Sequence, residues 1–256
     1  MTEAAPAARE TASSALSVAY RFTSGIAIVG ITAGTFASTV ITNEAGGMQF
    51  GALLTAVWMV LLVAGRLVVA PYLPLAIRTF GARPTFLFVK VASLILWVGL
   101  GILFALGIVG AASLYVTAPL CGAIAAFAST LTTLYTHAYV PGHGMSGALV
   151  RMAVVRGGSV AIGAVIGAAL VLTAGPAWGL MARGAFEIPV IVLLIFFRPT
   201  HEPSTPDASR KVWRGLRDDI RGNPSIIPLI TLGIGMTIFA MPFAQLLVPI
   251  TCLLYT

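Results

Sequence analysis

Long apolar blocks separated by short polar turns run along most of this chain. Each block has about 18 residues or more, which is enough for a helix to cross a hydrocarbon core of ~30 Å. Seven blocks meet this length, at residues 17–41 (with Phe22 as an alternative start), 49–72, 85–110, 112–137, 148–173, 178–197 and 226–250. The pattern therefore predicts an all-α polytopic membrane protein, with a six-helix bundle in residues 17–197 and a seventh transmembrane helix within 224–250.

The long polar run, residues 198–223, separates the sixth block from the seventh and predicts a solvated connector. Within it, apolar residues repeat at helical spacing beside a basic flank that includes Arg214 and Arg217. We expect an amphipathic helix at the inner membrane surface, anchored by Trp213, with a merely solvated linker helix as the alternative. Residues 1–16 are expected to form a short cytoplasmic tail, because they lack the apolar core of a secretory signal.

Composition agrees with the membrane assignment, since 58% of the 256 residues are hydrophobic and only 9% are charged, against roughly 25% charged in an average soluble domain. The net charge of +7 does not indicate nucleic-acid binding, because basic residues in membrane proteins mostly mark loop topology and contact anionic headgroups. The cysteines and histidines do not form a metal-binding pattern, and no clustered carboxylates suggest catalysis. We therefore expect no metal, no cofactor, no nucleic-acid partner and no enzymatic activity.

The distribution of Lys and Arg predicts how the chain crosses the membrane. Basic residues gather in the amino-terminal tail, after the second and fourth blocks, and in the connector. Because cytoplasmic loops carry the excess of positive charge, these segments are expected on the cytoplasmic side. The sequence thus predicts a multi-pass protein of the inner (plasma) membrane with a cytoplasmic amino terminus.

The segment LPLAIRTFGARP after the second block resembles the signature loop of the major facilitator superfamily, Gly-x-x-x-Asp-Arg-x-Gly-x-Arg. Gly81 and Arg83 stand at the positions of the family's second Gly and final Arg. Pro74 occupies the first Gly position and Arg78 the Asp position. In the family that Asp is held to latch the cytoplasmic face, so Arg78 removes the usual latch.

This resemblance implies a carrier of two six-helix bundles that moves a small molecule by alternating access. It implies secondary active transport, in the direction of efflux, with protons as a candidate coupling ion. The connector is similar to that of exporters of the enterobactin-exporter type. A non-transporting polytopic protein, either a scaffold or a membrane-embedded enzyme, remains the alternative.

The last six residues, 251–256, resemble the translation of a transposon-derived sequencing adaptor. We expect the genuine sequence to end near Ile250 and the natural reading frame to continue into further spans. By this expectation the chain is the amino-terminal part of a twelve-helix carrier.

The first and fourth blocks share a short sequence echo, residues 36–42 and 127–133. In a fold of three-helix inverted repeats these two spans are equivalent, and in the family that the chain resembles both face the central cavity. The candidate cavity residues are Thr35, Ser38, Thr39, Ser129, Thr130, Thr133 and Tyr135. Chance similarity is the alternative for the echo, and the hydroxyls also have the option of bonding to their own helix backbone.

Ionisable side chains inside spans are costly, so each needs a physical reason. Arg156 and Glu187 are candidates to meet each other or substrate inside the bundle, while Glu187 has Arg183, one turn earlier, as an alternative partner. Lys90 is expected to extend its ammonium to the headgroup layer. Arg66 is expected to brace the signature loop.

Two glycine pairs at a spacing of four residues, Gly30 with Gly34 and Gly163 with Gly167, predict close helix packing in the first and fifth spans. The second pair lies near the position of a Gly-Pro motif that the family associates with export. Here Ala164 follows Gly163 in place of the proline.

Overall fold

A computed structural model describes residues 4–139, 144–197 and 228. Its elements are α1 (Ala4–Val69), η1 (Ala70–Tyr72), α2 (Leu73–Phe80), α3 (Ala82–Ala105), α4 (Ala112–Tyr139), α5 (Gly144–Ala174), α6 (Pro176–Ala185) and α7 (Ile188–Phe196). Six segments in this part of the chain are long and apolar enough to cross a membrane: Ala15–Gly47, Phe50–Phe80, Ala82–Ala105, Ala112–Thr136, Arg151–Ala174 and Pro176–Phe196. The prediction of an all-α multi-pass membrane protein with these six spans is confirmed.

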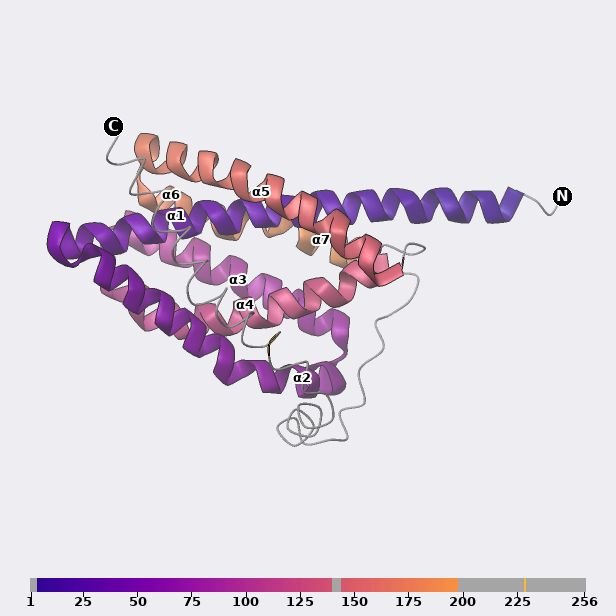
Figure 1. The fold of residues 1–256 in the computed structure, drawn as a ribbon, viewed down its shortest axis with the longest axis horizontal. Helices are drawn as coiled ribbons and strands as arrows, with labels where there is room; N and C mark the ends of the chain where they lie inside the picture. The colour runs from indigo at the N-terminus through magenta and orange to yellow at the C-terminus, as the bar shows by residue number, and fades with distance from the viewer. Residues whose placement is uncertain (1–3, 140–143, 198–227, 229–256) are drawn as a thin grey trace.

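Several sequence predictions concern residues outside the described ranges. They include the connector 198–223 with Trp213, Arg214 and Arg217, the seventh span apart from Pro228, and residues 251–256. At the other end of the chain, the residues of the expected tail from Ala4 onward are already helical and continue into the first span. Figure 1 shows this helix extending past the rest of the bundle toward the amino terminus.

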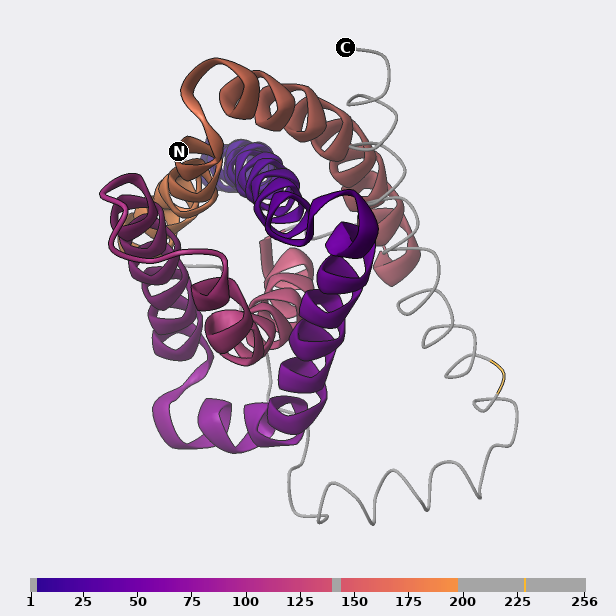
Figure 2. The same cartoon turned by 90° about the vertical axis from the view of Figure 1, so that its left-hand side faces the viewer.

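Helix α1 is a hairpin of two arms, because the chain reverses at Gly47, where φ is 59° and ψ is −168°. Residues with a Cβ atom rarely adopt such a positive φ, so glycine suits this turn. The first arm, Ala15–Gly47, lies against α4, α5 and α6, while α3 packs mainly on α6 (Figures 1 and 2). The opposite end of the bundle, where Gly81 precedes α3 and where α7 ends, is called the Gly81 end below.

Glycines allow the backbones of neighbouring helices to approach closely. A Cβ on Gly163 would lie 2.7 Å from the Val29 carbonyl oxygen, and one on Gly30 would lie 2.5 Å from the Phe186 Cβ. Gly167 and Gly34 are blocked in the same way, by Ala33 and Arg183 respectively. Both predicted glycine pairs therefore pack helices closely, with α6 on one side of the first arm and α5 on another.

The second arm of α1 and α4 are fitted together by a reciprocal pair of glycines. A Cβ on Gly65 would collide with the Pro119 carbonyl, and a Cβ on Gly122 would collide with the Leu62 carbonyl. The missing side chain of each glycine thus leaves space for the backbone of the other helix. This contact fixes the second span against the fourth.

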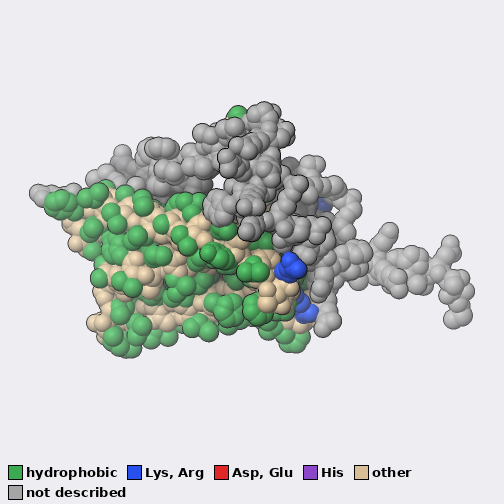
Figure 3. Space-filling view, turned by 90° about the horizontal axis from the view of Figure 1, so that it is seen from below, with side chains coloured by type: hydrophobic (Ala, Val, Ile, Leu, Met, Phe, Trp, Pro, Cys, Tyr) green, Lys and Arg blue, Asp and Glu red, His purple; other side chains and the backbone are tan. Residues whose placement is uncertain are grey.

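The surface of the bundle is largely hydrophobic. Many of its exposed side chains are large and apolar, among them Phe22, Phe88 and Val116. On the face drawn in Figure 3, Lys and Arg side chains appear only near one end of the described surface. Such a surface matches a hydrocarbon surrounding with basic residues toward one membrane boundary.

The segment after the second span differs from the expected loop. After a 3-10 turn at Ala70–Tyr72, eight of its residues form helix α2. Leu73 and Ile77, one turn apart, are both buried in the core cluster at this end of the bundle. Burial of these two side chains favours a helix where the resemblance to the signature loop suggested a loop.

The sixth span also differs, because it is broken in the middle into α6 and α7. Pro189 lies in the first turn of α7. Its ring has no N–H to donate to the residue four positions earlier and crowds that carbonyl, so a continuous helix is interrupted here. The break leaves Glu187 between the two half-helices.

We predict that Gly122→Ala destabilises the fold by about 1–3 kcal/mol, because the added methyl group has no space against the Leu62 carbonyl. Gly99→Ala is the matched control, since a Cβ on Gly99 meets no atom within 4 Å. The control is expected to be neutral or slightly stabilising. Unfolding by SDS titration of the purified protein measures both, and equal effects would contradict the packing argument.

Candidate functional site

A buried ion pair joins the third and sixth spans. The Lys90 Nζ donates a hydrogen bond to the Glu187 Oε2 at 2.7 Å, and both side chains are at most 5% exposed. By the helix rise of ~1.5 Å per residue, Lys90 lies about 12 Å from the start of α3 and Glu187 about 13 Å from the end of α7. The pair is therefore well inside the membrane span.

This pair corrects two expectations. Lys90 does not extend to the headgroup layer, because its ammonium is held by Glu187. Glu187 does not form an ion pair with Arg156 or Arg183; its salt bridge is with Lys90. The antiparallel course of the third and sixth spans brings the two groups to the same depth, whereas the sequence had suggested Arg156 on the fifth span or Arg183 on the sixth as the partner of Glu187.

Glu187 occupies the break of the sixth span. Its backbone N–H donates to the Gly184 carbonyl at 3.0 Å, and its own carbonyl accepts from the Ile191 N–H at 3.1 Å. The broken backbone is thus still hydrogen-bonded at this residue. Non-helical backbone at membrane depth occurs where protein or an aqueous cavity surrounds it, and here Glu187 is 2% exposed within the protein.

A second buried cation, Arg183, lies one turn before Glu187. Its guanidinium carbon is 3.8 Å from the centroid of the Trp97 ring, and its Nη1 donates to the Thr35 Oγ1 at 3.3 Å. Gly34 provides the space that the arginine chain fills. A cation stacked on the face of an indole is stabilised by electrostatic attraction to the ring. Through these two contacts, Arg183 of the sixth span connects the first and third spans.

Arg66 and Arg156 are on the second and fifth spans. Arg66 is half-buried, and its Nε is buried without a hydrogen-bond partner in the described structure. Arg156 is exposed. The expected role of Arg66 as a brace for the signature loop has no supporting hydrogen bond among the described residues.

The candidate hydroxyl residues divide into two groups. Ser38 and Thr39 are buried, and their hydroxyls donate to the carbonyls of Gly34 and Thr35 on their own helix. Ser129, Thr130 and Thr133 also bond to their own helix, yet they are exposed. With Leu134, these three line an open depression of about 250 Å³ on α4.

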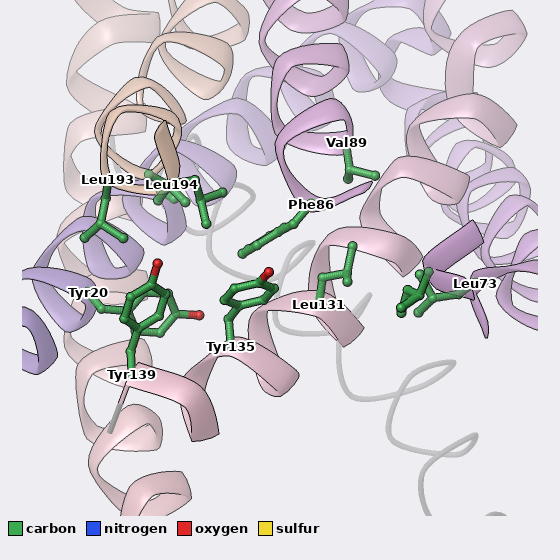
Figure 4. Packing of buried hydrophobic residues seen from close by; sticks show 12 residues of the cluster. Tyr20, Leu73, Phe86, Val89, Leu131, Tyr135, Tyr139, Leu193 and Leu194 are labelled. Atoms are coloured by element: carbon green, nitrogen blue, oxygen red, sulfur yellow. The ribbon is translucent and has the colours of Figure 1, made fainter. Parts of the chain in front are cut away.

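Tyr135 belongs to an aromatic cluster near the Gly81 end rather than to an open cavity. Its ring lies 5.1 Å from Phe86 and 5.9 Å from Tyr139, which stacks on Tyr20 at 4.7 Å (Figure 4). Burial raises the pKa of Tyr139 to about 12, so its hydroxyl stays protonated and donates to the Phe197 carbonyl. The Tyr20 hydroxyl donates to the Thr132 carbonyl. These bonds fix the first span, α4 and the end of α7 to one another.

The signature-loop residues have distinct surroundings. Gly81 ends α2 with a φ of 87°, and Pro74 lies in the first turn of that helix. Arg83 donates from Nε and Nη2 to the Leu194 carbonyl, at 2.9 and 2.6 Å, and from Nη2 to the Ile195 carbonyl at 2.9 Å. Arg78 is exposed. Arg83 thus caps the carboxyl end of α7, where carbonyls lack helical partners.

Sequence reasoning missed the pairing of Lys90 with Glu187 and the role of Arg83 as a helix cap. A signal for Lys90 was present, because it is the lysine of the third span and Glu187 the acid of the sixth at a similar distance from the Gly81 end. Comparing depths between spans, in place of spacing within one span, would have paired them. No group of three or more potential metal ligands occurs among the described residues.

We predict that Glu187→Gln and Lys90→Met each cost about 3–5 kcal/mol, because each leaves a buried charge without its partner. The double variant Lys90→Met/Glu187→Leu is expected to recover most of this loss, since it removes both charges. Thermal unfolding in mild detergent gives the double-mutant cycle. Simple addition of the two single losses would argue against a coupled pair.

We predict that Arg83→Gln destabilises the bundle by about 1.5–3 kcal/mol, through loss of its charge-assisted bonds to the end of α7. Arg78→Gln removes the same charge from an exposed position in the last turn of α2, and it is expected to be nearly neutral. Hydrogen exchange at residues 194–197 reports the local effect. Equal exchange in both variants would rule out capping by Arg83.

Comparison of the chain with models of known protein families, with curated proteins and with solved structures gives no match. The geometry above therefore carries the functional argument. Together with the sequence, it describes a six-span, multi-pass membrane protein that holds buried charge at the third and sixth spans and exposes hydroxyl groups on the fourth.

Proposed function

We propose that this protein is a secondary active transporter of the major-facilitator type, which exports a small molecule across the inner membrane by alternating access. The six described spans form one of its two bundles in this proposal. The observation that carries it is the depression on α4, where Ser129, Thr130 and Thr133 are exposed on a membrane-spanning helix. Hydroxyls in this position suit a hydrated pathway better than a lipid-facing surface.

The arrangement of the first span supports the same proposal. It lies against α5 and α6 through close backbone contacts, and rigid packing of this kind suits a bundle that rocks as one body. Arg78, Arg83 and Arg151 lie toward the Gly81 end. The positive-inside rule then favours the cytoplasm for that end and for the amino terminus.

A test of alternating access uses two cysteine variants of the complete two-bundle protein, in a background in which Cys121 and every other native cysteine are replaced by alanine. Thr130→Cys lies in the depression, and Phe88→Cys lies on the exposed apolar face of α3. Phe88 is about 9 Å from the start of the span Ala82–Ala105, and Thr130 is about 9 Å from the end of the span Ala112–Thr136, by a rise of ~1.5 Å per residue. Depth is therefore matched while the surroundings differ.

We predict that a membrane-impermeant thiol reagent modifies Thr130→Cys from either side of the membrane, in intact cells and in inverted vesicles, because alternating access opens the pathway to each side in turn. Phe88→Cys is expected to stay unmodified, since lipid covers it. Modification of Thr130→Cys from one side alone, or from neither, would favour a non-transporting scaffold or a membrane-embedded enzyme.

A further inference from the structure

Helix α2 begins where the second span has already crossed the membrane. From Phe50 to Val69 the second arm of α1 rises about 30 Å, at ~1.5 Å per residue, and a hydrocarbon core is ~30 Å thick. The 3-10 turn Ala70–Tyr72 follows, and α2 and Gly81 then connect this turn to the start of α3 at Ala82. Helix α2 is therefore placed at the membrane boundary of the Gly81 end.

Helix α2 is fixed to the bundle along one side. Its Leu73 and Ile77 side chains are buried in the core cluster at this end. The Thr85 hydroxyl of α3 donates to the Gly81 carbonyl at 2.6 Å and to the Ala76 carbonyl at 3.4 Å. Figure 2 looks along the long axis of the bundle, and it shows this segment running across the direction of the spans. The helix thus lies in the plane of the membrane surface.

The outer side of α2 carries Tyr72, Leu75 and Arg78, which are named the α2 stripe below. Residues three positions apart are neighbours on a helix surface, and Tyr72 has helical φ and ψ angles of −87° and −11°. Tyr72 is 60% exposed and Leu75 is 61% exposed, and Arg78 is exposed beside them. Apolar and aromatic side chains next to a base are typical of helices that lie between headgroups and acyl chains.

Arg78 has no salt bridge in the part of the chain that the structure describes, where the ion pair is that of Lys90 with Glu187. The sequence contains no Asp or Glu between Glu44 and Glu187. Glu44 lies beside the Gly47 turn, at the other end of the bundle. The second, third, fourth and fifth spans therefore bring no acid to Arg78, and its charge is open to an anion from the membrane surface.

We propose that the α2 stripe binds an anionic phospholipid, with the Arg78 guanidinium on the headgroup phosphate and with Leu75 and Tyr72 against acyl chains. The planar guanidinium matches two oxygens of a phosphate. Anionic lipids are abundant in the cytoplasmic leaflet, and the positive-inside rule favours the cytoplasm for this end. The inference goes beyond the proposed function, because it concerns the lipid around the bundle and holds whether or not the protein transports.

The test places the purified 256-residue chain in nanodiscs of phosphatidylcholine, or of phosphatidylcholine mixed with phosphatidylglycerol that has the same acyl chains. Hydrogen exchange at residues 73–80 is expected to be slower in the mixture. Native mass spectrometry is expected to give about fivefold tighter binding of phosphatidylglycerol than of phosphatidylcholine, since one basic group near an anionic surface contributes about this factor. Equal exchange in the two kinds of nanodisc would overturn the proposal.

Two variants locate the site. Arg78→Gln is expected to remove the protection at residues 73–80 and to weaken phosphatidylglycerol binding about fivefold. Arg151→Gln is the matched control, because Arg151 is also exposed and begins the fifth span at the same end. The control is expected to weaken binding less than twofold and to keep the protection of α2. Equal losses in the two variants would show general attraction to surface charge and refute a site on α2.

A second copy of the chain is the other occupant that an exposed stripe of this kind suits. In a background of Cys121→Ala and Cys252→Ala, Leu75→Cys is expected to form little disulfide-linked dimer in vesicles that contain phosphatidylglycerol. Efficient dimer formation there would assign the stripe to protein contact and overturn the lipid proposal. These measurements need no transport, so failure of the lipid site and failure of the transport proposal are distinguished.

Discussion

Close approach between helix backbones is the constraint on which this bundle depends. In a hydrocarbon solvent, apolar side chains gain little by leaving lipid for protein, so helices associate through packing and hydrogen bonds. The first span meets this requirement with glycines on its own surface and on its neighbours, at Gly30, Gly34, Gly163 and Gly167. The position of Arg183 depends on this close packing, because its side chain occupies the space beside Gly34.

The protein stabilises buried charge in three physically different ways. Lys90 and Glu187 neutralise each other across two helices. The Arg183 guanidinium stacks on the Trp97 ring and donates a hydrogen bond to the Thr35 hydroxyl. Arg83 donates hydrogen bonds to the unpaired carbonyls at the end of α7. Each arrangement joins elements that are distant in sequence, so the charged residues contribute to the assembly of the bundle as well as to its electrostatic field.

Hydropathy predicted the six spans well, because span length follows from membrane thickness and needs no knowledge of neighbours. The glycine pairs likewise predicted close contacts correctly. Helix rotation was harder to predict, since these helices are apolar on nearly every side and offer no polar face to orient them. For this reason Ser38 and Thr39 are buried while Ser129 and Thr130 are exposed, although the two segments have similar sequences. The Lys90 partner and the break before Pro189 likewise depend on contacts between spans.

The Lys90–Glu187 pair also constrains how the chain is made. Ninety-seven positions separate the two residues, and ribosomes add roughly 5–20 residues per second. The third span therefore exists for about 5–20 s before its acid is synthesised. During that interval an unpaired lysine must be kept near water or within the insertion machinery. The sixth span thus supplies the acid that neutralises the lysine of the third. Stable insertion of the third span therefore depends on the sixth.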